Sequence, residues 1–164
     1  MDNFYEQLVT TYKTGAYKSA NAAFYVFGVL ALVTLSVNLL LFAVFLILAI
    51  GAFFLKKSLY VEYEYVFTNG EIDIDKIVEM NKRKRVFTFD IKSVELLALE
   101  ESQYVKDFAN KPSKILTLYP KTSDKKVYVA MITGGTERVQ LRFVPDEEFV
   151  NLCYKYNPRA VKKY

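Results

Sequence analysis

The pattern of hydrophobic and polar positions divides the chain into one long apolar stretch and a longer region in which the two kinds alternate. No charged residue occurs between Lys18 and Lys56, and residues 19–55 are mostly Leu, Ala, Val and Phe. One helical crossing of a bilayer takes about 20 apolar residues. The stretch is too long for one comfortable span and long enough for two short ones, so it predicts a membrane protein.

In the interior of the apolar stretch, the only closely spaced polar side chains lie in the segment Thr34-Leu35-Ser36-Val37-Asn38. An Asn side chain inside the bilayer would need a hydrogen-bond partner, whereas Asn is well suited to a turn. We therefore predict a transmembrane α-helical hairpin over residues 19–57, with helices near residues 19–36 and 39–55.

The charges beside the hairpin predict its orientation. Lys13 and Lys18 precede it, Lys56 and Lys57 follow it, and the turn carries no charge. Positively charged residues stay on the cytoplasmic side of a membrane. The sequence therefore predicts a multi-pass protein of the plasma membrane with both termini cytoplasmic. A single long tilted span is the alternative, and it would export one pair of lysines.

Residues 1–18 contain a shorter apolar pattern. Apolar side chains recur at the spacing of one helix face, at Phe4, Tyr5, Leu8, Val9 and Tyr12. This spacing predicts an amphipathic N-terminal helix over residues 1–18 that packs at the interface and leads into the first span. A helix that docks on a partner is the alternative.

After Lys57 the hydrophobic period changes from that of a helix to that of a strand. Asn69-Gly70 separates two alternating segments, which is a strong signal for a β-hairpin. Folding about this turn places Phe67 opposite Ile72 on a core face and Glu64 opposite Asp75 on the other face. Because like charges directly opposite destabilise a sheet, we expect basic residues close to that acidic pair.

Further alternating segments follow, and then a helix. The predicted strands cover residues 60–67, 71–75, 85–90, 93–97, 115–119, 127–132 and 139–143. A C-terminal helix begins after Pro145 and buries the stripe of Phe149, Leu152, Cys153 and Tyr156. Residues 58–164 are thus predicted to form a cytosolic α+β or all-β domain with about seven antiparallel strands and a C-terminal helix.

Seven strands followed by one helix is the outline of a pleckstrin-homology (PH) domain. The segment 65–72, with the basic run and then residues 89–94, is similar to the opening of bacterial PH-like domains, which commonly sit beside a pair of membrane helices. More narrowly, the chain resembles an uncharacterised Firmicutes family of small two-span membrane proteins, through residues 1–8, 62–65 and 82–85. The resemblance implies a fold and a location, and it implies no activity.

One feature departs from the lipid-binding PH domains of eukaryotes, which carry basic residues in and around the first strand–strand loop. On the predicted strands that loop is Asn69-Gly70, which is too short to hold a headgroup and is flanked by acids. Phosphoinositide binding at this loop is therefore not expected.

Composition narrows the classes of function. The net charge of +4 arises from 22 Lys and Arg against 18 Asp and Glu, and this modest excess does not predict nucleic-acid binding. The chain has one cysteine, Cys153, which we expect to be a buried thiol, and it has no histidine, the commonest general base and zinc ligand. We expect no enzyme activity, no cofactor, no metal site and no small-molecule substrate.

The basic run of Lys82, Arg83, Lys84 and Arg85 is the candidate contact site, and it has two interpretations. Successive strand residues point to opposite faces, so the four charges cannot form one flat patch on a regular strand. Pairing with Glu62, Glu64, Asp73 and Asp75 is the favoured interpretation. Contact with anionic lipid or with a partner is the alternative.

These features favour a membrane-anchored, non-enzymatic PH-like module for interaction or scaffolding. Its expected partners are the lipid bilayer and a protein of unknown identity, which would dock at a strand edge or in the groove beside the helix. The alternative is an accessory subunit of a larger membrane complex that assembles through the hairpin. The small-residue face of Ala20, Ala23, Phe27, Ala31 and Thr34 favours that alternative.

Overall fold

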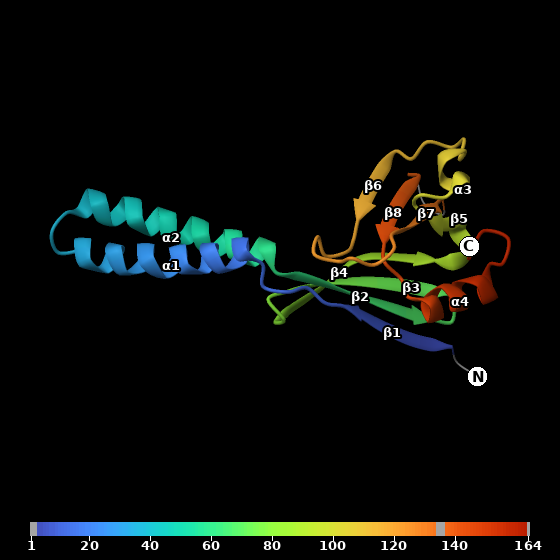
Figure 1. The fold of residues 1–164 in the computed structure, drawn as a ribbon, viewed down its shortest axis with the longest axis horizontal. Coiled ribbons are helices and arrows are strands. Elements are labelled where there is room, and N and C mark those ends of the chain that lie inside the picture. Colours follow the sequence, from blue (N-terminus) through green and yellow to red (C-terminus); the bar gives the residue numbers. More distant parts are fainter. Residues whose placement is uncertain (1–2, 134–136, 164) are drawn as a thin grey trace.

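The computed structural model describes residues 3–133 and 137–163, and in that part the chain forms a helical hairpin and two four-stranded sheets (Figure 1). The hairpin consists of α1 (Gly15–Thr34) and α2 (Leu39–Leu59). The first sheet has the order β1-β2-β3-β4, with β1 (Phe4–Val9), β2 (Val61–Thr68), β3 (Glu71–Val78) and β4 (Lys82–Asp90). The second has the order β5-β7-β8-β6, with β5 (Val94–Leu99), β6 (Lys114–Thr117), β7 (Tyr128–Ile132) and β8 (Val139–Phe143).

A 3-10 turn and two further helices complete the described fold. The 3-10 turn η1 (Ile91–Ser93) joins the two sheets, and α3 (Gln103–Lys106) follows β5. The last helix, α4 (Glu147–Tyr156), lies across the end of the two sheets that is far from the hairpin (Figure 1).

The prediction of an N-terminal amphipathic helix over residues 1–18 is wrong. Residues 4–9 form β1, which pairs antiparallel with β2 from Phe4 opposite Thr68 to Val9 opposite Tyr63. The apolar pattern fits both periods, because Tyr5 and Val9 also share one face of a strand. Residues 4–9 form a strand because they pair with the edge of β2 and bury side chains in the core beneath it. The first helix, α1, begins only at Gly15.

Side chains of β1 attach it to the start of α4. The Gln7 amide donates to the carbonyl of Val144 at 3.0 Å, and its oxygen accepts from the backbone N–H of Asp146 at 2.9 Å. The Tyr5 hydroxyl donates to the Asp146 carboxylate at 2.7 Å, and this hydrogen bond is the main reason that the pKa of Tyr5 is raised to about 12. Residues 4–9 are therefore an integral part of the domain that was predicted to begin at residue 58.

The helical hairpin is the connection between two neighbouring strands. Because β1 and β2 are the first two strands of one sheet, residues 10–60 form the loop between them (Figure 1). Asn69-Gly70 is thus the second strand connection of the domain, and the prediction that it is the first is wrong. Its φ angles of 52° and 103° are those of a tight hairpin turn, and the predicted pairs Phe67–Ile72 and Glu64–Asp75 are confirmed.

The two long helices have the length and composition of membrane spans. They pack against each other along one face of each helix. Each is about 30 Å long at 1.5 Å per residue, and both are apolar enough to cross a bilayer. Asn38 lies in the turn as predicted, where its side chain caps α2 by accepting from the N–H groups of Leu40 and Leu41. The buried residues of the hairpin are alanines, namely Ala20, Ala31, Ala49 and Ala52.

The core lies between the two sheets and under α4. Phe149 is fully buried and makes edge-to-face contacts with Tyr65, Phe67 and Phe143. Cys153, one turn further along α4, is also fully buried, and burial raises the pKa of its thiol to about 12. The predicted inward stripe of the C-terminal helix is confirmed by both residues.

The prediction of about seven antiparallel strands needs two corrections. The chain has eight strands in the described residues, because β1 adds to the seven that were predicted. In addition, β6 pairs with β8 in parallel, from Lys114 opposite Val139 to Thr117 opposite Arg142. Between them in the sequence, β7, which is antiparallel to β8, carries the chain back, which allows the parallel pair.

The contribution of β1 can be tested with two soluble chains. A fragment of residues 58–164 lacks β1, leaves Val144 and Asp146 without their Gln7 partner, and is expected to lose cooperative unfolding. A chain in which a short Gly/Ser linker replaces residues 15–59 is expected to fold, because the hairpin ends meet, with the Tyr17 and Tyr60 rings 5.6 Å apart. Thermal melts followed by circular dichroism compare the two, and an equally sharp melt of residues 58–164 contradicts this assignment.

Candidate interaction surface

The basic run lies at the start of β4, where a bulge determines which side chains share a face. Asp75 is opposite Arg85 and Ile74 is opposite Phe87, so Val86 has no residue opposite it. This extra residue reverses the alternation of the strand. Arg85 therefore points to the outer face of the sheet although Phe87, two residues later, points to the core.

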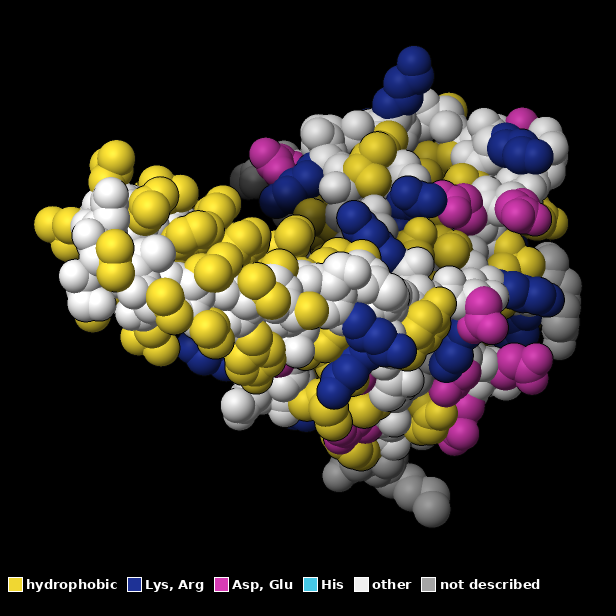
Figure 2. Space-filling view, turned by 60° about the vertical axis from the view of Figure 1, so that its left-hand side comes forward, with side chains coloured by type: hydrophobic (Ala, Val, Ile, Leu, Met, Phe, Trp, Pro, Cys, Tyr) yellow, Lys and Arg dark blue, Asp and Glu magenta, His cyan; other side chains and the backbone are white. Residues whose placement is uncertain are grey.

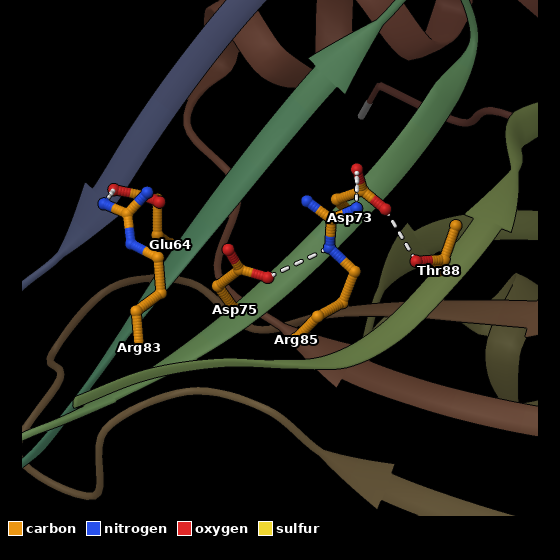
Figure 3. A network of polar contacts seen from close by, with 6 residues as sticks. All are labelled: Glu64, Asp73, Asp75, Arg83, Arg85 and Thr88. Carbon is orange, nitrogen blue, oxygen red and sulfur yellow. Dashed lines mark hydrogen bonds and ion pairs between the residues drawn. The ribbon is translucent and has the colours of Figure 1, made fainter.

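The two arginines of the run pair with acids on the outer face of the sheet (Figure 3). Arg83 contacts Glu64 at 2.6 Å, and Arg85 contacts Asp73 at 2.9 Å and Asp75 at 3.2 Å. Three of the four acids predicted to neutralise the run thus do so. The fourth, Glu62, instead accepts a hydrogen bond from the backbone N–H of Thr11 at 3.4 Å.

Glu64 is the most deeply buried acid of this face. Its side chain is 3 % exposed, and Arg83 binds only one of its carboxylate oxygens. Within the described residues, Oε2 of Glu64 has no donor. Burial raises the pKa of Glu64 first of all, the adjacent Glu6 carboxyl raises it further, and Arg83 acts in the opposite direction. The outer face therefore holds two acids side by side with too few cations.

The two lysines of the run point to the other face and are used differently. Lys82 and Lys84 are exposed, and among residues 3–133 and 137–163 neither forms an ion pair. Lys84 lies directly opposite Lys76 of β3. The basic run is thus two sets of charges, a neutralised pair of arginines and an unneutralised pair of lysines.

The turn between β3 and β4 lies against the end of the helical hairpin. The backbone N–H of Glu79 donates to the carbonyl of Tyr60 at 3.1 Å, and the Glu79 carboxylate is 3.6 Å from Nζ of Lys56. Met80 follows with φ at 58° and a side chain that is 73 % exposed. The lysines of β4 therefore begin beside the point where α2 ends.

The C-terminal segment after α4 pairs with β5. The backbone N–H of Leu97 donates to the carbonyl of Ala160 at 2.9 Å, and the backbone N–H of Lys162 donates to the carbonyl of Leu97 at 2.7 Å. Val161 forms a parallel bridge with Leu97 and is buried. Sequence reasoning missed this isolated bridge. A groove beside α4 remains, with Leu99, Tyr128 and Val150 among its lining residues.

The layout of strands and C-terminal helix defines a PH-like domain, and a comparison with protein families agrees. Residues 1–163 match the family model described as bacterial PH-like domain (DUF6106). The match covers nearly the whole chain, and the protein belongs to this family of bacterial PH-like domains. No curated protein and no solved structure matches the chain.

The different roles of arginines and lysines predict different effects on stability. Arg83→Gln leaves the buried Glu64 carboxylate without its cation and is expected to lower the free energy of unfolding by about 1–3 kcal/mol. Lys82→Gln, one residue away, removes an exposed unpaired charge and is expected to change it by less than about 0.5 kcal/mol. Thermal or denaturant unfolding in mild detergent measures both, and equal losses would show that the bulge assignment is wrong.

The pairing of Glu6 with Glu64 predicts a pH dependence. A carboxyl whose pKa is raised on folding favours the native state when it is protonated, so this stability is lost as the pH rises above the unfolded value of 4.5. Glu6→Gln removes one of the two charges and supplies a donor, and it is expected to add roughly 1 kcal/mol at pH 7.5. The gain should shrink as the pH falls toward about 5. A gain that does not depend on pH, measured by unfolding across this range, contradicts the coupling.

Proposed function

We propose that this protein is a membrane-anchored, non-enzymatic PH-like module that holds a protein partner at the cytoplasmic face of a bacterial plasma membrane. The single observation that carries the proposal is the apolar hairpin placed between β1 and β2. Its side chains facing outward are almost entirely hydrophobic, and Lys and Arg gather at its base (Figure 2). This finer description agrees with the resemblance to two-span Firmicutes membrane proteins.

The hairpin supports two crossings with both ends on one side. Its base carries Lys13, Lys18, Lys56 and Lys57, together with the paired rings of Tyr17 and Tyr60. Lysines at the cytoplasmic ends and tyrosines at the interface are typical of membrane spans. The far turn is uncharged, so translocating it across the bilayer carries no penalty for moving a charge.

The place of the hairpin in the fold gives the anchor a purpose beyond attachment. An anchor at a chain terminus leaves a domain free to rotate on its linker. Here both ends of the hairpin continue into adjacent strands of one sheet, β1 and β2, so the domain is held at the surface in a restricted orientation. Such a restriction suits a module that presents one face to a partner.

The exposed face of β1 is the surface we assign to the partner. Phe4 is 61 % and Leu8 is 47 % exposed on the outward side of this edge strand, which has no neighbouring strand beyond it in the described sheet. The opposite edge, β4, is rich in lysine and arginine, which is a common protection against strand addition. Apolar side chains at an unprotected edge are the features that strand-adding partners use.

The alternative of an accessory subunit loses its main support. The small residues of α1 that favoured it include Ala20 and Ala31, which are buried against α2. They serve the packing of the hairpin itself rather than a face left for another helix.

The proposal is tested first by the topology of the hairpin. Reporter fusions after Lys18, at Asn38 and after Tyr164 are expected to report cytoplasm, exterior and cytoplasm. An exterior C-terminus would overturn the anchoring part of the proposal.

The second part of the same test concerns the partner. The full chain, purified from native membranes in mild detergent, is expected to retain a partner that a Phe4→Ser/Leu8→Ser variant loses. A matched variant, Tyr104→Ser/Ile115→Ser, removes two similarly exposed apolar side chains elsewhere, at 53 % and 60 %, and should retain it. Equal retention by all three chains overturns the assignment of β1.

A further inference from the structure

The tip of the β3–β4 hairpin carries groups that the packing of the domain does not use. Met80 is exposed at the turn, and Lys82 and Lys84 extend along one face of β4 with Lys76 opposite Lys84. In the part of the chain that the structure describes, these three lysines have no ion-pair partner. Like charges directly opposite destabilise a strand pair. The sheet thus carries a local repulsion that an anionic neighbour would relieve.

The position of this tip relative to the long helices indicates what that neighbour is. The hydrogen bond from Glu79 to Tyr60 and the ion pair of Glu79 with Lys56 hold the turn beside the end of α2. Lys82 begins β4 directly after the turn, and at about 3.3 Å per residue Lys84 lies roughly 7 Å further along the strand. The Debye length under cellular conditions is about 8 Å. If α2 spans the bilayer, Met80 is at its surface and both lysines, with their long side chains, are within electrostatic reach of it.

We propose that Met80, Lys76, Lys82 and Lys84 form a contact surface for the anionic phospholipids of the bilayer that holds α1 and α2. The proposal rests on the membrane anchoring proposed above. The thioether side chain of Met80 enters the headgroup layer, and the lysine ammonium groups lie against lipid phosphates. Arg83 and Arg85 take no part, because Glu64, Asp73 and Asp75 hold them on the opposite face.

The chemistry of the surface fits a lipid layer better than an acidic protein. Lysine is a flexible, strongly hydrated point charge that follows a fluid array of phosphates, whereas defined bidentate recognition uses arginine. The exposed apolar side chain of Met80, at the tip of the turn, can be buried among the lipids of a bilayer. A contact of this kind needs no headgroup pocket, which agrees with the absence of a basic cradle at Asn69-Gly70.

The experiment uses the full chain in vesicles of phosphatidylcholine, with and without phosphatidylglycerol. An environment-sensitive fluorophore is attached to Met80→Cys, with Ile47→Cys in α2 and Tyr104→Cys in α3 as separate reference positions. Native Cys153 is fully buried, and the unsubstituted chain controls for its labelling. Quenching by spin-labelled lipids reports contact with the bilayer.

We expect the label at position 47 to be quenched in both kinds of vesicle and the label at position 80 to be quenched chiefly when phosphatidylglycerol is present. The label at position 104 should be quenched in neither. High salt should reduce the Met80 signal. The quenching gives the ratio of chains whose β3–β4 turn contacts lipid to chains whose turn does not. Lys82→Gln/Lys84→Gln should lower this ratio about fivefold per lysine. The matched variant Lys106→Gln/Lys111→Gln, which removes two exposed lysines near α3, should leave it unchanged.

The reference positions separate the two proposals. If Ile47 is not quenched, the membrane anchoring itself is wrong. If Ile47 is quenched but Met80 is not, the anchoring stands and the lipid contact is wrong. Quenching of Met80 that responds neither to phosphatidylglycerol nor to the lysine substitutions overturns the role of the lysines. Because no other protein is present, a requirement for an acidic protein would appear as the absence of Met80 quenching.

Discussion

The antiparallel pairing of β1 with β2 is the constraint on which the rest of the structure depends. It joins residues 4–9 to residues 63–68 and thereby closes the entire helical hairpin into a loop of the sheet. The pairing also places Gln7 against Val144 and Asp146, so that the same strand holds the N-terminus of α4. Without it, the hairpin and the domain would be two bodies on a flexible link. With it, the end of α2 has a fixed place beside the β3–β4 turn.

The charges of the domain are arranged around this geometry. On the outer face of the first sheet, half-exposed Arg83 and Arg85 cover acids that are nearly buried. On the other face, lysines of the same strand remain unneutralised next to the hairpin base. One short basic segment therefore serves two purposes, internal neutralisation and an outward positive surface, because alternate strand positions point in opposite directions.

Much of the fold could be predicted from local signals. The Asn69-Gly70 turn defined the register of β2 and β3, Asn38 marked the turn of the helical hairpin, and Pro145 with an apolar stripe marked α4. The strand β1 could not be predicted in this way, because the pattern from Phe4 to Val9 fits a helix and a strand equally, and only its partner β2 decides. The parallel strand β6 and the C-terminal segment on β5 also depend on long-range pairing that no local pattern encodes.

The candidate site was predictable in part for a similar reason. The acids expected to neutralise the run were mostly correct, since Glu64 and Asp75 follow from the β2–β3 register. Which basic residues meet them depends on the bulge at Val86. A regular strand would have directed Lys82 and Lys84 toward the acids, and the sequence carries no signal for the extra residue.

The central claim, that the apolar hairpin is an insertion between two paired strands, can be tested directly by cross-linking of the full chain. Phe4 and Thr68 face each other at exposed positions, and the N–H of Asn69 donates to Asn3, so they form the closer, non-hydrogen-bonded kind of pair. A Phe4→Cys/Thr68→Cys chain is expected to form a disulfide under mild oxidation, seen as resistance of both thiols to maleimide until reduction. A Leu8→Cys/Thr68→Cys chain, out of register by four residues, should remain reactive. Equal reactivity of the two chains would contradict the pairing of β1 with β2 and with it the proposed place of the hairpin.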